Sequence, residues 1–188
     1  EIEINNTDTI APYLKNYNGN YTITNNNLIN NKSNDGNLTL INTKVQSKIT
    51  NNGMLNLTNS IINSTINNTG VLYIDNNTIF TENGAIIGLG EIVTDNITRI
   101  IPYIETITGN YTITDTTLDK TLKFLGNITI TNCNITSTDN INMKILNISN
   151  CNITVPDENI FITNYDLLIL NNTTNITDKI ENMGNIFY

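Results

Sequence analysis

Two cysteines are the most reactive side chains in this chain, and both lie in the same local sequence. Cys133 and Cys151 each stand in a segment Asn-Cys-Asn-Ile-Thr, about one repeat apart. If these segments stack, the two Cα atoms fall within the separation that a disulfide allows. The alternative is two small buried thiols at a position that Ser or Thr occupies elsewhere. We favour stacked thiols, because the place of the cysteines in the repeat already explains them.

Other catalytic chemistry has little support in the residue types. The chain has no histidine, which excludes Ser-His-Asp and Cys-His arrangements and imidazole metal sites. Three acidic residues, Asp75, Asp115 and Asp119, lie near predicted strand ends, but they are scattered and do not recur at one position. Solvated charge explains them better than catalysis, and we expect no enzyme activity, metal or cofactor.

Asn-x-Ser/Thr triplets are abundant, with about 17 along the chain. A strand that alternates inward Ile with outward Asn and Thr produces this triplet automatically, so part of the excess is structural. In an exported protein the same triplets are acceptors for N-linked glycans. The candidate glycosylation sites are Asn20, Asn37, Asn56, Asn110, Asn127 and Asn147.

The element that positions these side chains is a short repeat. The phrase Gly-Asn-Tyr-Thr-Ile-Thr begins at Gly19 and again at Gly109, and degraded copies begin at Gly36, Gly53, Gly70 and Gly126. Copies lie about 17 residues apart, an interval typical of one turn of a β-solenoid. The sequence therefore predicts an all-β chain, a parallel β-helix with coils of about 17–22 residues.

Within each copy, apolar and polar residues alternate and a corner follows. The alternation predicts a strand with one buried face, and alignment of the copies stacks Leu38, Leu55 and Leu72 over one another. Asn is favoured at the corners because it tolerates left-handed backbone angles. The predicted corner ladder consists of Asn26, Thr43, Ser60, Asn77 and Thr116.

The short repeat lies inside a longer duplication. Glu1-Ile2, Pro12 and the first Gly-Asn-Tyr phrase recur about 90 residues later as Glu91-Ile92, Pro102 and the second phrase. We interpret residues 1–90 and 91–188 as two homologous modules of one continuous solenoid. The same interval also suits tandem immunoglobulin-like sandwiches, which we retain as the alternative fold, although even 17-residue spacing is unusual for a sandwich.

Charge and hydropathy argue against two kinds of partner, nucleic acid and the membrane interior. A net charge of −8 argues against nucleic acid, which needs clustered Lys or Arg. No apolar run approaches the roughly 20 residues needed to cross a bilayer, so we expect no membrane insertion by this segment. Since the chain begins at Glu1 without a methionine and its last residues would run into another Glu1, we expect one unit of a longer tandem array.

These Asn/Ile/Thr-rich coils, the Gly-Asn-Tyr-Thr-Ile phrases and the Asn-x-x-Ile corners resemble the adhesin-like parallel β-helix surface proteins of methanogenic archaea. The resemblance covers nearly the whole chain. It implies a right-handed coil displayed outside the cell, and it carries over no catalytic residues.

We therefore expect a non-enzymatic extracellular protein, a solenoid unit of a fibre, sheath or stalk at the cell surface. Its partners would be neighbouring copies of itself end to end, and glycans or other components of a cell surface. The alternative function is a carbohydrate-binding or carbohydrate-cleaving β-helix, suggested by Tyr13, Tyr103 and Tyr165.

Overall fold

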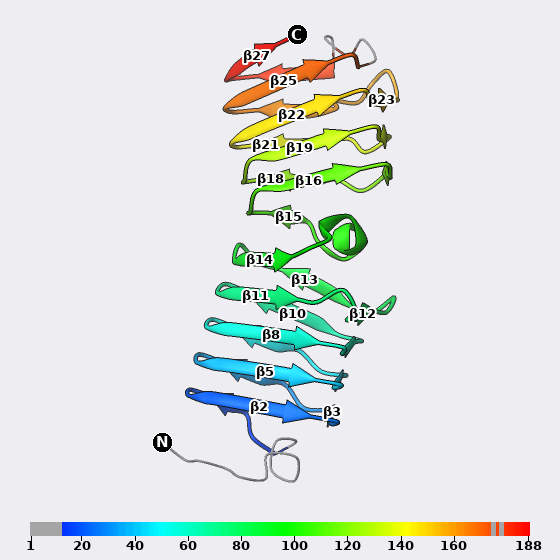
Figure 1. The fold of residues 1–188 in the computed structure, drawn as a ribbon. Coiled ribbons are helices and arrows are strands. Elements are labelled where there is room, and N and C mark those ends of the chain that lie inside the picture. Colours follow the sequence, from blue (N-terminus) through cyan, green and yellow to red (C-terminus); the bar gives the residue numbers. More distant parts are fainter. Residues whose placement is uncertain (1–12, 174–175, 177–178) are drawn as a thin grey trace. The chain divides into compact units, whose positions relative to one another are not determined.

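The computed structural model describes residues 13–173, 176 and 179–188. The chain divides into two compact units, Glu1–Asn96 and Ile97–Tyr188. Each unit is a stack of coils whose strands pair in parallel with those of the next coil (Figure 1). The predicted parallel β-solenoid is confirmed. The alternative of immunoglobulin-like sandwiches is wrong, because sandwiches are antiparallel, whereas every strand pair among the described residues is parallel.

The first unit contains three sheets, and successive strands along the chain pass from one sheet to the next. Sheet A consists of β1 (Asn16–Tyr17), β4 (Lys32–Asn34), β7 (Ile49–Asn51), β10 (Thr65–Asn68) and β13 (Ala85–Ile87). Sheet B consists of β2 (Asn20–Thr24), β5 (Asn37–Ile41), β8 (Met54–Thr58), β11 (Val71–Ile74) and β14 (Glu91–Thr94). Sheet C consists of β3 (Asn27–Leu28), β6 (Lys44–Val45), β9 (Ile61–Ile62) and β12 (Ile79–Phe80).

The second unit repeats this plan after a 3-10 helix, η1 (Ile97–Tyr103), which includes Pro102. Sheet D consists of β15 (Thr106–Ile107), β18 (Lys123–Phe124), β21 (Asn140–Asn142), β24 (Ile162–Asn164) and β26 (Ile180–Asn182). Sheet E consists of β16 (Tyr111–Thr114), β19 (Ile128–Thr131), β22 (Ile145–Ser149), β25 (Leu167–Asn171) and β27 (Asn185–Phe187). Sheet F consists of β17 (Thr117–Leu118), β20 (Asn134–Ile135) and β23 (Asn152–Ile153).

The first unit ends a few residues later than the 90-residue repeat predicts. β14, which begins at Glu91, pairs with β11 and so completes the first stack, although the 90-residue interval assigns Glu91 to the second module. The landmarks Glu1-Ile2 and Pro12 lie outside the described residues.

Register within the stacks follows the repeat closely. Leu38 lies opposite Leu55, and Leu55 lies opposite Leu72. The paired residues are 17 apart in the first coils of each unit, and the interval lengthens to 22 where Ile148 meets Leu170. The predicted coil length of about 17–22 residues is therefore confirmed.

Side-chain alternation explains why these residues form these strands. In sheet B the stacked leucines Leu38, Leu55 and Leu72 are fully buried. The residue that follows each leucine in its strand faces outward. A single coil cannot cover its own apolar face, so each coil is stabilised by burial against the next.

The corner between sheets B and C requires a left-handed backbone. The first corner residue of three consecutive coils has a positive φ of 54°, 50° and 46°, at Asn25, Asn42 and Asn59. Asn and Asp are the non-glycine residues that tolerate this region best. The predicted preference for Asn at a left-handed corner position is confirmed, but the residues that adopt it lie one before the predicted ladder residues Asn26, Thr43 and Ser60.

The glycines before β5, β8 and β11 of sheet B are explained by close approach of neighbouring coils. A Cβ on Gly53 would fall on the carbonyl oxygen of Gly36, and a Cβ on Gly70 would fall on that of Gly53. None of the three has a positive φ. Glycine is needed here because neighbouring coils approach too closely for any side chain.

Candidate functional site

The corner between sheets B and C carries a buried ladder of hydroxyl groups. The backbone N–H of Thr43 donates to Oγ of Ser60 at 3.1 Å, and the N–H of Ser60 donates to Oγ1 of Thr78 at 3.3 Å. Thr43, Ser60 and Thr78 are buried. The sequence alignment placed Asn77 at this position, which is wrong by one residue, because β12 pairs Phe80, not Ile79, with Ile62.

The remaining members of the predicted corner ladder are less enclosed. Asn26 and Thr116 are half-buried, and Asn77 is exposed. Oδ1 of Asn26 accepts a hydrogen bond from the N–H of Asn27, which starts the next strand.

A second ladder, made of amides, runs along the outside of the same corner. Nδ2 of Asn42 donates to Oδ1 of Asn25 at 3.2 Å, and Nδ2 of Asn59 donates to Oδ1 of Asn42 at 2.6 Å. All three side chains are exposed. Each side-chain amide offers two N–H groups and two acceptor positions, so the ladder leaves hydrogen-bonding capacity directed to solvent.

A groove of about 680 Å³ follows this corner across four coils of the first unit. One wall is the amide ladder, and the other is the outward column of sheet C, where Asn27, Lys44, Ile61 and Ile79 are paired in register. In Figure 1 the corner lies where the sheet B arrows end beside β3 and β12. The lining residues are Asn25, Asn26, Asn27, Asn42, Thr43, Lys44, Asn59, Ser60, Ile61, Asn77 and Ile79.

Asp75 holds the last coil of this corner in place. Its carboxylate accepts hydrogen bonds from the N–H of Asn59 at 3.0 Å and from the N–H and Oγ1 of Thr78 at 2.8 and 2.6 Å. Burial alone would raise the pKa of Asp75, but the hydrogen bonds from Thr78, Asn59 and Asn77 outweigh it and lower the pKa below its usual value. The geometry makes Asp75 a structural anion at the corner.

Cys133 and Cys151 occupy the equivalent buried ladder in the second unit. Both are free thiols, and the N–H of Cys133 donates to Sγ of Cys151 at 3.4 Å, as Thr43 donates to Ser60 in the first unit. Burial raises the pKa of the Cys151 thiol, which the hydrogen bond from Cys133 offsets only in part. A raised pKa makes the nucleophilic thiolate scarce at neutral pH.

A third ladder, inside the stack, has no counterpart in the sequence-based prediction. Nδ2 of Asn34 donates to Oδ1 of Asn51, and Nδ2 of Asn51 donates to Oδ1 of Asn68, each at 2.7 Å. All three residues are fully buried, and each amide also donates to a backbone carbonyl of the following coil, for example Asn51 to Val71 at 3.0 Å. The second unit contains the same ladder at Asn142, Asn164 and Asn182.

This interior ladder has a signal that could have revealed it. In the first unit each of its asparagines stands two residues before a stacked glycine, in the segments Asn34-Asp35-Gly36, Asn51-Asn52-Gly53 and Asn68-Thr69-Gly70. At its first coil the position below Asn34 is taken by Tyr17, whose ring is buried and packs edge-on against Tyr21 at 5.3 Å. Burial, and to a lesser extent Tyr21, raises the pKa of Tyr17 to about 12.

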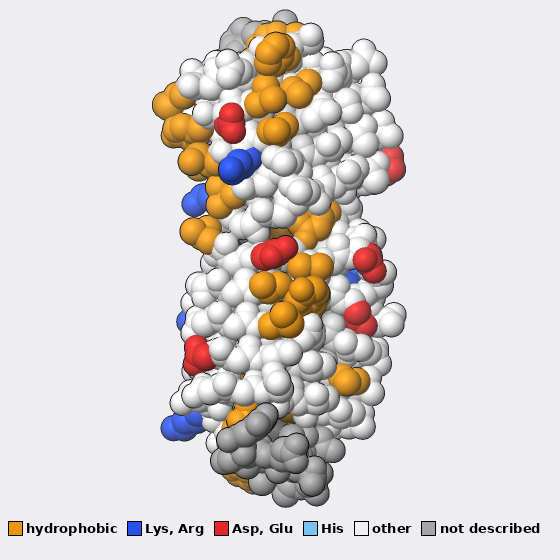
Figure 2. Space-filling model, turned by 60° about the vertical axis from the view of Figure 1, so that its left-hand side comes forward, with side chains coloured by type: hydrophobic (Ala, Val, Ile, Leu, Met, Phe, Trp, Pro, Cys, Tyr) orange, Lys and Arg blue, Asp and Glu red, His pale blue; other side chains and the backbone are white. Residues whose placement is uncertain are grey.

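The candidate glycosylation sites differ in accessibility. Asn20, Asn110 and Asn127 are exposed, whereas Asn37, Asn56 and Asn147 are half-buried. Nδ2 of Asn56 is already engaged with Oδ1 of Asn37 at 3.2 Å and Oγ1 of Thr39 at 3.3 Å. On the face seen in Figure 2, neutral polar side chains and backbone cover most of each unit, with few charges.

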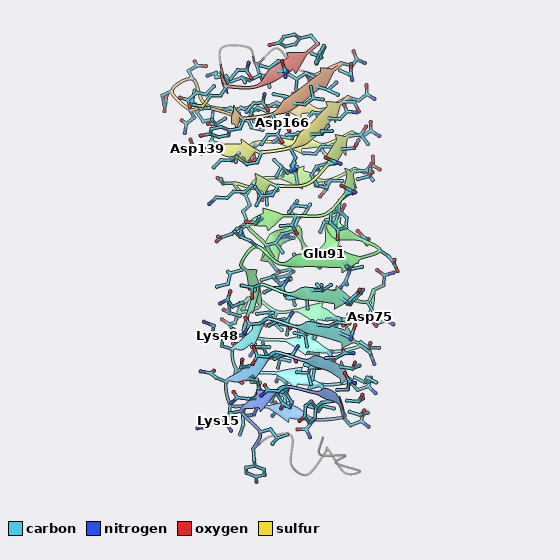
Figure 3. All side chains as sticks on the ribbon, turned by 90° about the vertical axis from the view of Figure 1, so that its left-hand side faces the viewer. Lys15, Lys48, Asp75, Glu91, Asp139 and Asp166 are labelled. Carbon is cyan, nitrogen blue, oxygen red and sulfur yellow. The ribbon has the colours of Figure 1, made fainter. Side chains whose placement is uncertain are left out.

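The acidic residues and tyrosines considered for carbohydrate chemistry are spread over different elements. In the first unit Asp75 lies on the opposite edge from Lys15 and Lys48 in Figure 3, and Tyr13 precedes β1. In the second unit Tyr103 ends η1, Tyr165 follows β24, and Asp115 and Asp119 flank β17. Within the described residues, no three His, Cys, Asp or Glu side chains gather closely enough to hold a metal ion.

The described part of the chain contains no helix that is long and apolar enough to cross a membrane. Comparisons with protein-family models, curated proteins and solved structures found no match to this chain.

Proposed function

We propose that this chain is a non-enzymatic structural or adhesive element displayed outside the cell, a solenoid unit of a fibre, sheath or stalk. The observation that carries the proposal is the continuous parallel register of each stack, with Leu38, Leu55 and Leu72 directly opposed. Such a stack is stabilised mainly by contacts between neighbouring coils, so it can be lengthened by adding coils without redesigning the core.

The surface chemistry supports the same proposal. The candidate acceptors Asn20, at the start of β2, and Asn110 and Asn127, immediately before β16 and β19, are all exposed. Each is followed two residues later by threonine. Exposed acceptors of this kind suit a glycosylated protein outside the cell.

Neighbouring copies are the proposed structural partners. β27 forms the edge strand of sheet E and is paired with β25. Phe187, in β27, and Tyr188, directly after it, expose 60% and 71% of their surface. A strand from another copy or from a tandem repeat could continue this ladder, because an edge strand offers unpaired N–H and C=O groups.

Surface labelling of intact source cells tests the proposal. Antibodies raised against the purified chain, detected by immunogold electron microscopy, should label the outer surface, and brief protease treatment of intact cells should remove the label. A cytosolic enzyme from the same cells serves as the control for cell integrity. Label confined to the cell interior would refute the proposal.

A further inference from the structure

The groove along the corner of the first unit is a built feature whose occupant the proposed function does not specify. Its floor is closed, because the hydroxyls of Thr43 and Ser60 donate to backbone carbonyls of their own coils at 3.0 and 2.9 Å. The unsatisfied polar capacity therefore belongs to the walls, and chiefly to the amides of Asn25, Asn42 and Asn59.

The walls present two kinds of chemistry side by side. The amide wall offers neutral donors and acceptors in a row, one side chain per coil. On the facing wall Ile61 and Ile79 are adjacent in register and expose 40% and 57% of their surface, and Lys44 adds its aliphatic stem. A ligand that fits has polar edges and an apolar face, as a pyranose ring has.

The spacing of equivalent side chains along each wall favours some polymeric ligands over others. Equivalent side chains recur about every 4.8 Å along the stack, the distance between paired strands. That interval is close to the length of one pyranose residue in an extended β-linked glycan. An extended peptide rises about 3.3 Å per residue, so its groups would drift out of step with the coils.

Charge excludes a polyanionic ligand from the same groove. Lys44 is the single charged residue among the lining side chains, and the chain as a whole has a net charge of −8. A nucleic acid or densely anionic polymer needs several neutralising cations. The lining is matched instead to an uncharged polymer.

We propose that this corner groove binds an extended, uncharged, β-linked glycan that lies along the stack across four coils. The amides of Asn42 and Asn59 bond hydroxyl or acetamido groups along one edge of the glycan, and Ile61 and Ile79 contact a ring face. The inference deepens the proposed surface function by naming a partner class, but binding by the purified chain does not depend on where the protein resides.

Isothermal titration of the full chain with chitohexaose and cellohexaose tests the inference. Binding of at least one hexamer is expected, and the double substitution Asn42→Gly, Asn59→Gly should weaken it about tenfold through loss of the wall hydrogen bonds. Glycine is chosen because both positions have a positive φ, so the backbone is retained while the amides are removed. Ile61→Thr, on the facing wall, should weaken the same binding while keeping a strand-forming residue.

The matched control is Asn52→Ala. Asn52 lies in the same stretch of coil as Asn59 and also takes part in an exposed ladder, donating to Asp35 at 2.7 Å, but at another corner. This variant should bind like the parent chain, and circular dichroism should show that all variants are folded. The inference would be overturned if neither hexamer bound, if the double substitution left binding unchanged, or if the coiled, α-linked maltohexaose bound equally well.

The two proposals fail in different ways. Intracellular immunogold label would remove the surface function and leave measured glycan binding intact. Surface label with no binding of either hexamer would remove the glycan groove and leave the structural function intact.

Discussion

Asn34 and Asn51 are joined inside the first unit by a hydrogen bond from Nδ2 to Oδ1 of 2.7 Å, although both are fully buried in an apolar stack. In this ladder the Nδ2 group of each residue donates both to the next asparagine Oδ1 and to a backbone carbonyl of the following coil. Oδ1 of Asn34, at the first step, has no hydrogen-bond partner among the described residues. Buried amides are tolerated only when they are paired in this way, so the ladder also fixes the register between coils.

Removing the middle amide of this ladder should be costly. Asn51→Ala leaves one N–H of Asn34 and the Oδ1 acceptor of Asn68 without partners and opens a cavity, so we expect a loss of about 3 kcal/mol in the free energy of unfolding. Urea denaturation followed by circular dichroism measures it. Asn52→Ala, at the exposed neighbouring position, should change the value by about 0.5 kcal/mol or less. Equal effects at the two positions would contradict the role given to the interior ladder.

Alanine substitutions at two glycines test whether glycine is needed because neighbouring coils approach closely or because the backbone needs its freedom. Gly53→Ala would place a methyl group on the carbonyl oxygen of Gly36, and we expect a loss of about 2 kcal/mol or more. At Gly19 the nearest neighbour of an added Cβ is the Tyr21 ring at 3.6 Å, an ordinary contact. Gly19→Ala should therefore be neutral or stabilising by a few tenths of a kcal/mol, roughly. Thermal unfolding of both variants tests the pair, and tolerance of alanine at Gly53 would show that the coils are not so close.

The two buried thiols should be unreactive in the folded protein. Cys133 and Cys151 are 2% and 4% exposed, and burial raises the pKa of Cys151, so iodoacetamide should label them only after unfolding. Mass spectrometry before and after denaturation counts the labelled thiols. Cys151→Ser should keep the hydrogen bond from Cys133, since Ser60 accepts the equivalent bond in the first unit, and should cost about 1 kcal/mol. Rapid labelling of the native chain, or a mass two hydrogens lower without reductant, would be inconsistent with free stacked thiols.

Asp75 makes the first unit sensitive to acid. Its folded-state pKa is lowered, so the stability that it contributes is complete above the unfolded value near 3.8 and is lost as the pH falls through the folded value. At neutral pH, Asp75→Ala should cost about 1–2 kcal/mol through loss of its bonds to Asn59 and Thr78, a figure reduced for partial exposure. Unfolding measured from pH 7 to pH 2 should show a smaller acid-induced loss in this variant than in the parent chain.

The control for the acid experiment is Asp119→Ala, which removes an exposed carboxylate from the second unit. This variant should follow the acid profile of the parent chain. If Asp75→Ala followed the parent profile as well, the carboxylate would not be a structural anion.

The stacking of sheet B could be predicted because its signal is strict. Apolar residues alternate with polar ones at a constant interval, and each of the first coils has the same length. Only one alignment of the copies is therefore possible, and it places Leu38, Leu55 and Leu72 at equivalent positions. The sequence predicted Asn77 where the structure has Thr78, because the turn at Asp75 holds one extra residue. A one-residue shift there leaves an equally polar pattern of Asn, Asn and Thr.

The strands of sheet A and the buried amides could not be read from hydropathy. β4, β7 and β10 each contain buried asparagine beside a glycine turn, and such a segment is typical of a loop when the hydrogen bonds between coils are not known. The sequence-based prediction therefore lacks the sheet A strand that each coil of the first unit contains. The groove was missed for the same reason, since its shape depends on how the exposed corner amides align in space.

The measurement that tests the central claim most directly is nuclear Overhauser spectroscopy on chain labelled at leucine methyl groups. Direct stacking predicts strong cross-peaks between Leu38 and Leu55 and between Leu55 and Leu72, and none directly between Leu38 and Leu72, which lie two strand spacings, about 9.6 Å, apart. Absence of the first two cross-peaks in the folded protein would contradict the stacked solenoid.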